Sequence, residues 1–523
     1  MSIYAGITPR GYLVMVLASI GAILFGFDNG WWGTVLGETA FLCDYGGLVE
    51  VKGVMTCNLS TAKQSLGSGI GSAGIMVGCA AAMYINKALG RRKSLAVTAI
   101  VSIVGIVIEM TSAIGSKARF GQFVGGKVIN SIAMGLACNI IPVYLSETSI
   151  ASARGFVINM YQTAQIIGVI VAAGSVYAVS SRTDSSAYLI PMGVQFVAPT
   201  LMLAATFFIV ESPRWLVWQG RQEEAVQAAS DLFHTGDNDF DANVYCEKLA
   251  VAFEDERKLA ATTGWADLLR QPDLRRVLIA IGIQALQQAQ GSSYMTTYIV
   301  SFLIGTGVTN YFPIVMALYC VYAVAIMTAF YFPDVIGRRP LLIGTSAVCA
   351  ACLIIVAIFT TVYENPPPAI QKVSIALIFI WYFSFGVQSP LIWIITSESA
   401  PTRNREKVIG MGTFWGFGVA LIITFVSPYI QDAGYGNLGS KIGFLWGAFS
   451  IINIIWSFFF VPEYKGFSLE QLDYLFEQRT PTRKFAGYHF ADQVLATEQQ
   501  VEQIFLPDGK EKEGNVTPNE LLA

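Results

Sequence analysis

The chain has 523 residues, of which 54% are hydrophobic and only 13% are charged. Because about a quarter of the residues in soluble globular proteins are charged, this composition excludes an ordinary soluble enzyme or binding domain. It predicts a protein that crosses a lipid bilayer many times. The formal net charge of -3 points to no charged partner, and we expect no nucleic acid among the partners.

Twelve apolar runs along the chain are each long enough to cross a bilayer of about 30 Å as a helix. They occupy residues 11–37, 66–86, 94–114, 120–145, 155–180, 188–210, 277–304, 312–332, 341–362, 373–396, 408–431 and 442–461. The first run is too long for a cleavable signal peptide. The sequence therefore predicts an all-α membrane protein with twelve transmembrane helices.

Basic residues gather in the loops after the even-numbered spans, and loops rich in Lys and Arg face the cytoplasm. These residues are Arg91, Arg92, Lys93, Arg154, Arg338, Arg339, Arg403, Arg405 and Lys407. Both termini are then expected in the cytoplasm of a multi-pass protein of the plasma membrane. The segment 38–65 is expected outside, where Cys43 and Cys57 can form a disulfide and Asn58 can accept a glycan.

Several motifs recur about 250 residues apart. GRRKSL at 90–95 returns as GRRPLL at 337–342, and SETSIASARG at 146–155 is echoed by SESAPTRNREK at 397–407. Six spans are followed by six more with the same motifs in their loops, which predicts two pseudo-symmetric six-helix bundles around a central site. We expect the bundles at 1–210 and 277–462, cytoplasmic linker helices at 211–276 and a cytoplasmic tail at 463–523.

Charged residues at the cytoplasmic helix ends recur in both halves and are spaced to form ion pairs that hold the inner side closed. The set is Arg91, Glu147, Arg154 and Glu211 in the first half, and Arg338, Glu398, Arg405 and Glu463 in the second. Opening toward the cytoplasm would break these pairs. The alternative is that the basic residues only fix the topology.

Three charged residues lie within the spans: Asp28, Glu109 and Lys127. The stretch around Lys127 is close to a phosphate-binding loop, but Val128 stands where such a loop needs Ser or Thr. A charge at membrane depth costs several kcal/mol unless it is paired or faces water. Helical rise puts Asp28 and Lys127 each about 25 to 27 Å from the inner ends of their spans, so they can meet. Glu109 reaches a similar level, as an alternative partner or as a snorkelling residue near the outer face.

Taken together, the motifs resemble the sugar porter branch of the major facilitator superfamily over residues 9–476. They are FGFDNG at 25–30, GRR twice, PVYLSE at 142–147, ESPRWL at 211–216, QQ at 287–288 and PEYKG at 462–466. The resemblance implies alternating access, in which two bundles rock about a sugar bound near the middle of the bilayer. The long first outer loop is similar to that of fungal members.

The resemblance places sugar contacts at Gln162, Gln287, Gln288 and Trp393. Ser293, Tyr298 and Tyr322 are further candidates. Amides donate and accept hydrogen bonds with hydroxyl groups, and an indole packs on the apolar face of a pyranose. The alternative for the amides is hydrogen bonding between helices.

The match to the family is incomplete. Ser293 and Tyr322 stand where the family often has Asn, so a hexose preference does not follow. Lys87 replaces the aspartate of the first GRR motif, which Asp334 keeps in the second, so tight closure of the first loop does not follow either.

In the family's proton symporters an acid stands at the position of Asp28 and a basic residue, normally Arg, at that of Lys127. The resemblance implies that Asp28 accepts the proton and that Lys127 is its partner. The alternative is a permanent salt bridge in a facilitator.

We therefore expect a monomeric carrier for a monosaccharide, a hexose or pentose, working by proton symport with no metal and no cofactor other than the proton. The alternatives are a facilitative carrier, a carrier for a disaccharide, polyol or sugar acid, and a sugar sensor that transports nothing. We expect no enzyme, since His234 and His489 lie outside the spans and we find no nucleophile elbow or nucleotide loop.

Overall fold

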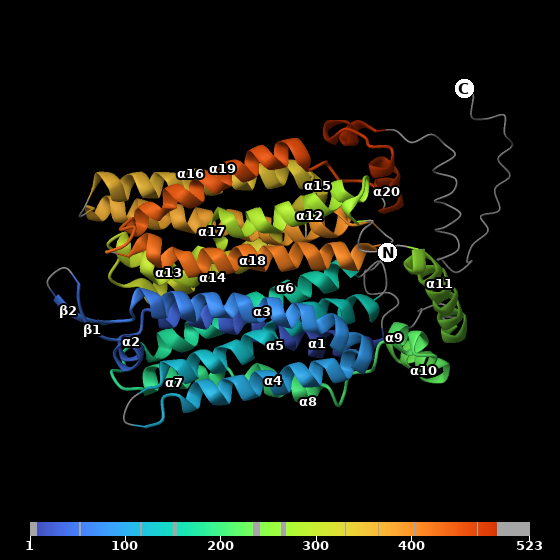
Figure 1. Ribbon diagram of the computed structural model, residues 1–523, viewed down its shortest axis with the longest axis horizontal. Coiled ribbons are helices and arrows are strands. Elements are labelled where there is room, and N and C mark those ends of the chain that lie inside the picture. The colour runs from blue at the N-terminus through green and yellow to red at the C-terminus, as the bar shows by residue number, and fades with distance from the viewer. Residues whose placement is uncertain are drawn as a thin grey trace.

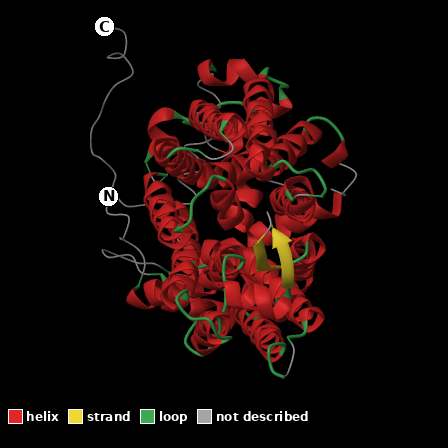
Figure 2. Cartoon of the chain, turned by 90° about the vertical axis from the view of Figure 1, so that its left-hand side faces the viewer, coloured by secondary structure: helices red, strands yellow, loops and turns green. Residues whose placement is uncertain are grey.

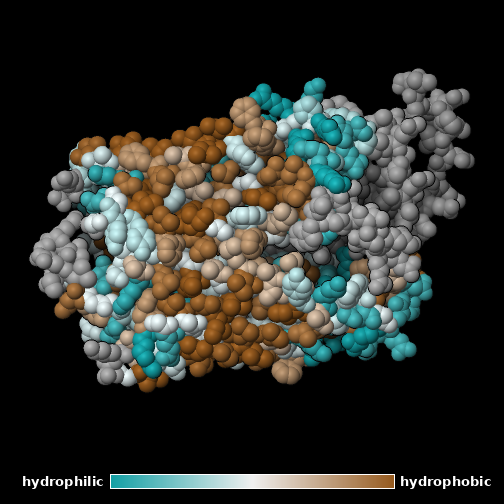
Figure 3. Space-filling model, in the orientation of Figure 1, coloured by the Kyte–Doolittle hydropathy of each residue, from teal (hydrophilic) through white to brown (hydrophobic). Residues whose placement is uncertain are grey.

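The computed structural model describes residues 8–488 except 52–53, 116–117, 150–153, 234–240, 263–267, 330, 364–365, 402–403, 433 and 468. Figure 1 shows two groups of long helices that run side by side, with a strand pair at one end and short helices at the other. We call these ends the hairpin end and the linker end. Figure 3 shows a hydrophobic belt between hydrophilic ends, as expected for a protein embedded in a bilayer.

The first bundle contains six spans, five of them single helices. The elements are α1 (Pro9–Val35), α3 (Thr61–Leu89), α4 (Arg91–Thr111), α5 (Phe120–Glu147), α6 (Arg154–Val179), and the pair α7 (Ser186–Val194) and α8 (Val197–Ala205). The sixth span divides between α7 and α8. Pro199 explains the division, because it has no N–H to donate to the carbonyl of Gln195 four residues earlier.

The second bundle repeats this arrangement, with an irregular seventh span. Its elements are α12 (Asp273–Gln287), η3 (Gln288–Ser292), α13 (Ser293–Gly305), α14 (Tyr311–Thr328), α15 (Phe332–Ile336), α16 (Arg338–Val362), α17 (Pro368–Ser399), α18 (Arg405–Gln431), η5 (Gly439–Ile442) and α19 (Gly443–Phe460). Eleven helices in the described part of the chain are long and apolar enough to cross a membrane. The seventh span, α12–η3–α13, completes the predicted twelve in two bundles.

Short elements cover both ends of the bundles. The linker end carries α9 (Pro213–Trp218), α10 (Gln222–Leu232), α11 (Ala242–Thr262), α20 (Leu469–Glu477) and η6 (Thr482–Gly487). The hairpin end carries α2 (Thr39–Tyr45) and the antiparallel strands β1 (Gly47–Val51) and β2 (Val54–Asn58), shown in yellow in Figure 2. The sequence predicted no strands, so the all-α expectation holds for the spans but not for this loop.

Helices α1 and α6 approach each other closely through glycine. A Cβ added to Gly26 would lie 1.8 Å from the carbonyl oxygen of Gln165, and one added to Gly30 would lie 2.9 Å from Val169. Small residues let the backbones of membrane helices come this near. The contact fixes the rotation of α1 and therefore the direction in which Asp28 points.

Because this contact has no room for a methyl group, Gly26→Ala should lower the free energy of unfolding by about 1 to 3 kcal/mol. The melting temperature of the purified protein in detergent measures the effect. Gly125→Ala is the matched control, since no heavy atom lies within 4 Å of the Cβ it would add. Equal melting temperatures for the two variants would contradict the close approach of α1 and α6.

The two bundles touch each other near the hairpin end. The Tyr311 hydroxyl donates to the carbonyl of Gly37 at 2.8 Å, and the Thr61 hydroxyl donates to the carboxylate of Asp432 at 2.6 Å. A Cβ on Gly33 would lie 2.3 Å from the carbonyl oxygen of Thr296. Helix α1 therefore belongs to the first bundle and also presses against the second.

Candidate functional site

Asp28 lies buried within α1, where three donors from two other parts of the first bundle converge on its carboxylate. The Lys127 ammonium nitrogen lies 3.2 Å from Oδ2. The amide nitrogens of Asn130 and Gln195 lie 3.1 and 2.9 Å from Oδ1. Asp28 and Lys127 are only 3% and 2% exposed. The structure therefore forms the pair that helical rise allows and that the family resemblance implied, and the pair faces the interior of the bundle.

The local structure explains why these donors meet. Lys127 and Asn130 are three residues apart on α5 and so share one face of the helix. The Ser102 hydroxyl of α4 donates to Oδ1 of Asn130 at 2.7 Å, which turns the amide nitrogen toward Asp28. Gln195 sits at the break between α7 and α8, where its side chain can reach inward.

Two indole rings enclose the other side of the ammonium group. The Lys127 nitrogen lies 4.9 Å from the ring centroid of Trp32 and 5.7 Å from that of Trp31. Indole faces attract a cation. The Trp32 N–H donates to the Ser68 hydroxyl at 2.7 Å, which holds the ring in place.

This arrangement can act as a switch that responds to protonation. A buried ion pair is stable only while both charges are present, because removing one leaves the other uncompensated. Protonation of Asp28 would remove its attraction for Lys127. The proton-coupling role of this pair stays a prediction.

Glu109, the third charged residue predicted within the spans, is fully buried on α4, with 0% of its surface exposed. Neither carboxyl oxygen has a hydrogen-bond partner among the described residues. The snorkelling alternative is therefore wrong, because a snorkelling side chain would reach water. Glu109 interacts electrostatically with both Asp28 and Lys127.

The amide pair of the predicted sugar site lies where the seventh span is irregular. Gln287 ends α12 and Gln288 begins η3. Gly291 within η3 has a φ of 105°, which only glycine adopts readily. Wide helical turns of this kind are frequent at functional sites.

Hydrogen bonds hold both amides in this region. The oxygen of Gln288 accepts from the Ser293 hydroxyl at 2.6 Å, and the nitrogen of Gln287 lies 3.4 Å from the Ser389 hydroxyl of α17. Trp393 follows Ser389 by four residues and is half-buried on α17. Tyr322 of α14 stacks on Phe385, with 5.9 Å between the ring centroids.

Two predicted sugar contacts lie apart from this group. Gln162 is half-buried on α6 in the first bundle, and no described hydrogen bond joins it to the amides of the seventh span. Tyr298 is 1% exposed, and its hydroxyl donates to the carbonyl of Thr424 at 2.7 Å and lies 3.5 Å from that of Gln64. The structure therefore places Tyr298 in the contact between the bundles, where its hydroxyl already donates its proton to a backbone carbonyl.

The predicted ion pairs at the linker end form within each bundle. Arg91 contacts Glu147 at 2.6 Å in the first, and Arg338 contacts Glu398 at 3.1 Å in the second. Arg338 also contacts Asp334 at 2.9 Å. Their gating role stays a prediction.

Glu211 and Glu463 play equivalent parts in the two halves. Glu211 accepts from the backbone N–H of Arg91 at 2.8 Å, and Glu463 accepts from that of Arg338 at the same distance. A carboxylate at a helix N-terminus satisfies free N–H groups and favours the helix dipole. Burial raises the pKa of Glu211, an effect that the N–H groups partly offset.

Two of the predicted gating arginines are described less fully. Arg154 begins α6, and its side chain lies outside the described residues, while Arg405 begins α18.

Lys87, which replaces the aspartate of the first GRR motif, lies over the ring of Trp218 at 5.1 Å, and its carbonyl accepts from the Trp215 indole at 3.1 Å. The loop between α3 and α4 is thus anchored to α9 by Trp215 and Trp218.

At the hairpin end, Cys43 and Cys57 form a disulfide, which joins α2 to β2. Asn58 follows at the end of β2, and its side-chain oxygen lies 3.4 Å from the amide nitrogen of Gln64. Glycosylation of Asn58 stays a prediction.

The structure also brings together several polar residues that the sequence did not single out. Asn130 could have been found from its spacing to Lys127, but no local pattern singles out Gln195. A second set is buried in the second bundle, where Gln388 accepts from Gln290 at 2.5 Å and donates to Ser346 at 2.6 Å. These hydrogen bonds link helices, which is the alternative role considered for the predicted sugar-binding amides.

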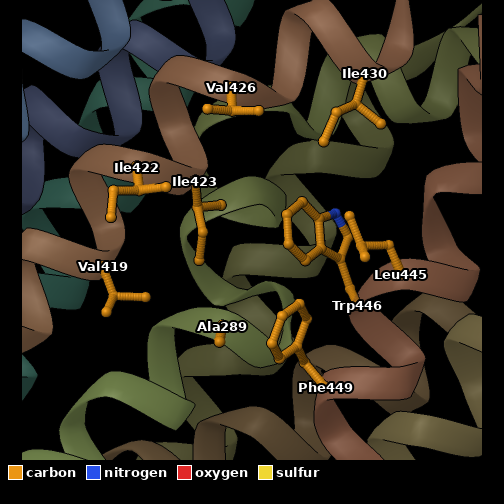
Figure 4. Close-up of a pocket in the computed structure, with 9 residues that line it drawn as sticks. All are labelled: Ala289, Val419, Ile422, Ile423, Val426, Ile430, Leu445, Trp446 and Phe449. Atoms are coloured by element: carbon orange, nitrogen blue, oxygen red, sulfur yellow. The ribbon is translucent and has the colours of Figure 1, made fainter. Parts of the chain in front are cut away.

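An apolar pocket of about 230 Å³ lies beside η3. Figure 4 shows its lining, which is Ala289, Val419, Ile422, Ile423, Val426, Ile430, Leu445, Trp446 and Phe449. Its hydrocarbon walls offer almost no hydrogen bonds to the hydroxyl groups of a sugar.

Two six-helix bundles, a buried ion pair and an irregular seventh span define a membrane carrier of the major facilitator type. The chain belongs to the sugar (and other) transporter family, whose model matches residues 14–476.

Curated relatives cover most of this chain. It is 27% identical over 485 residues to the major facilitator-type transporter ecdD of Aspergillus rugulosus, covering 90% of this chain and 88% of that protein. It is 26% identical to hexose transporter HXT10 of Saccharomyces cerevisiae, covering 92% and 87%. It is also 27% identical to the high glucose sensor RGT2 of Saccharomyces cerevisiae, covering 89% of this chain but only 60% of the sensor.

Among solved structures, the inward open xylose transporter XylE from E. coli is similar in fold. The TM-score is 0.70 at 20% sequence identity, with 89% of this chain and 99% of that chain covered. Its partially occluded inward open conformation gives a TM-score of 0.72 at 18% identity, covering 88% and 100%.

Proposed function

We propose that this protein carries a monosaccharide, a hexose or pentose, across the plasma membrane together with a proton. The observation that carries the proposal is the buried pair of Asp28 and Lys127 within a sugar transporter fold. A structural salt bridge of this kind is costly in a membrane, and a carboxylate that one proton can neutralise gives the pair a role in transport. The proton is a co-substrate, and the proposal includes no other cofactor and no catalytic activity.

Polar residues of the second bundle support a sugar as the substrate. Gln287, Gln288 and Ser293 supply neutral donors and acceptors, and Trp393 supplies an indole face. Gln162 would complete the site from the first bundle when a sugar draws the two together. One relative is named a hexose transporter and one similar structure a D-xylose-proton symporter, which agrees with a neutral sugar.

The contacts at the hairpin end support an alternating-access cycle. We infer that the hairpin end faces the outside and the linker end, with both termini, faces the cytoplasm. Closing the outer side uses the contacts of Gly33, Thr61 and Tyr311 with the second bundle. The ion pairs at the linker end, Arg91 with Glu147 and Arg338 with Glu398, would rearrange as the inner side opens and closes. One chain holds both bundles, so a monomer suffices.

Uptake by cells that lack their own sugar carriers tests the proposal. Labelled hexoses, pentoses, disaccharides, polyols and sugar acids are offered with and without a protonophore. We expect one monosaccharide to accumulate above its outside concentration and the protonophore to reduce it to equilibrium. Equilibration without accumulation would indicate a facilitator.

A sugar sensor is the second candidate, because the chain is 27% identical to a protein named a high glucose sensor. A sensor shares the fold and binds sugar without net flux. Binding of a sugar with no uptake of any compound in the panel would favour this candidate.

A further inference from the structure

Glu109 is a buried acid that the proposed cycle does not yet use. It is 0% exposed, and neither carboxyl oxygen has a hydrogen-bond partner in the described part of the chain. An ionised carboxylate in such surroundings is strongly unfavourable, whereas the protonated acid is tolerated. The surroundings of Glu109 in this structure therefore favour the protonated acid over the carboxylate.

The packing of α4 on α5 brings Glu109 to the level of the ion pair. A Cβ on Gly126, next to Lys127 in the chain, would lie 2.6 Å from the backbone nitrogen of Glu109. A Cβ on Gly105 would lie 2.6 Å from the backbone nitrogen of Asn130. The helices cross closely at these two glycines, so the side chains on either side share one buried space.

The titratable groups around Glu109 come from three elements. Asp28 of α1 and Lys127 of α5 act on it electrostatically, and Tyr45 of α2 is a third neighbour. The Tyr45 hydroxyl is hydrogen-bonded to Ser112 at 2.6 Å, and burial raises the pKa of Tyr45 to about 12. Tyr45 therefore stays neutral, and the charge in this space is set by the other three groups.

The balance of charge limits how Asp28 can be protonated. With Asp28 ionised, Lys127 charged and Glu109 protonated, the buried group is neutral overall. If Asp28 alone gains a proton, Lys127 is left as an unpaired cation in the membrane, which is strongly unfavourable. If Glu109 becomes ionised at the same time, the group stays neutral.

We propose that Glu109 is the alternate partner of Lys127 and the acid that exchanges its proton with Asp28. This inference rests on the proposed proton symport. In the exchange the O–H bond of Glu109 breaks and an O–H bond on Asp28 forms, so the negative charge moves from Asp28 to Glu109. Lys127 remains protonated and changes partner from α1 to α4.

The exchange has a mechanical consequence for α1. In the present conformation Lys127 ties α5 to α1, whereas after the exchange it ties α5 to α4, on which α5 is already packed. Helix α1 is then released from its ionic contact. Because α1 also touches the second bundle at Gly33, its release is transmitted to the contact between the bundles.

Thermal stability of the purified full-length protein in detergent tests the exchange without measuring transport. Asp28→Asn should be tolerated, since Glu109 can ionise and pair with Lys127, and Glu109→Gln should have a small effect. The double variant has no partner for Lys127. Its melting temperature should fall by at least about 5 °C more than the sum of the two single shifts. Adding Lys127→Met to the double variant should restore its melting temperature.

A matched control uses Glu38, a buried acid of the hairpin end that is 2% exposed and lies on the loop before α2. Asp28→Asn combined with Glu38→Gln should show additive shifts. Additive shifts for the Asp28 and Glu109 pair as well would overturn the exchange.

Infrared spectroscopy gives a second test that does not need the Asp28 variants to fold. The wild-type protein at neutral pH should show the carbonyl bands of buried protonated carboxylic acids, and Glu109→Gln should remove one band that Glu38→Gln leaves in place. A difference spectrum between the wild type and Glu109→Gln that lacks such a band would overturn the inference.

Transport in proteoliposomes separates this inference from the proposed function. With an imposed proton gradient, Glu109→Gln should lower accumulation at least about 10-fold, as expected when Lys127 loses its alternate partner. If the wild type ignores the gradient while the stability shifts remain non-additive, symport fails but the exchange of partners stands. If the wild type is driven by protons and the shifts are additive, only the exchange fails.

Discussion

Replacing Asp28 by Asn should abolish uptake of sugar against a gradient while exchange of sugar across the membrane continues. The amide keeps the shape of the side chain but cannot take up a proton, so proton movement no longer drives the cycle. A proton that crosses 100 mV and one pH unit supplies about 3.7 kcal/mol, enough for an accumulation of a few hundredfold. The ratio of inside to outside sugar should fall from such a value to about one.

Two measurements on the same cells or vesicles check this result. Net uptake of labelled sugar under a proton gradient gives accumulation, and counterflow with unlabelled sugar on the opposite side gives exchange. Asp184→Asn is the control, because Asp184 is an exposed acid in the loop before α7, outside the ion pair. Accumulation that survives in Asp28→Asn would show that Asp28 is not the coupling group and that the pair is structural.

Replacing Gln288 by Leu should lower sugar uptake at low substrate concentration by about 100-fold. Leucine keeps much of the volume but removes a donor and an acceptor. Two hydrogen bonds to a sugar hydroxyl, each contributing about 1 to 1.5 kcal/mol, account for a change of this size. The initial rate of uptake, corrected for the amount of protein in the membrane, measures it.

Ser293→Ala provides the matched control for Gln288. Ser293 donates to the oxygen of Gln288 at 2.6 Å, so its loss frees the amide without removing it. We expect a reduction of less than about 10-fold for a single hydrogen bond. If Gln288→Leu transports as well as the wild type, the amide links parts of the protein and does not contact the sugar.

The spans and their arrangement could be predicted from the sequence because hydrophobic length and helical rise are local properties. Twelve apolar runs and the repeated motifs were sufficient for two six-helix bundles. The same rise along α1 and α5 placed Asp28 and Lys127 at one depth, and the structure joins them at 3.2 Å. The cost of an unpaired charge in a membrane called for a partner, and the family resemblance singled out this pair, because Glu109 lies at a similar depth.

Other features depended on tertiary packing. The direction of a side chain around its helix axis is set by neighbouring helices, so depth could not tell whether Glu109 faces lipid or the ion pair. The close crossing at Gly105 and Gly126 turns it inward. The two strands at the hairpin end are a further feature that the pattern of apolar spans did not indicate.

The sequence by itself determined that this chain crosses the membrane twelve times in two repeated six-helix bundles, and that two acids and one base lie at similar depth. Only the tertiary structure decided which groups complete the site. Gln195 reaches Asp28 because α7 and α8 divide, and Gln288 begins a wide turn because Gly291 takes a φ of 105°. Proline and glycine allow such breaks locally, but the partner that each freed side chain reaches depends on contacts between helices distant in the chain.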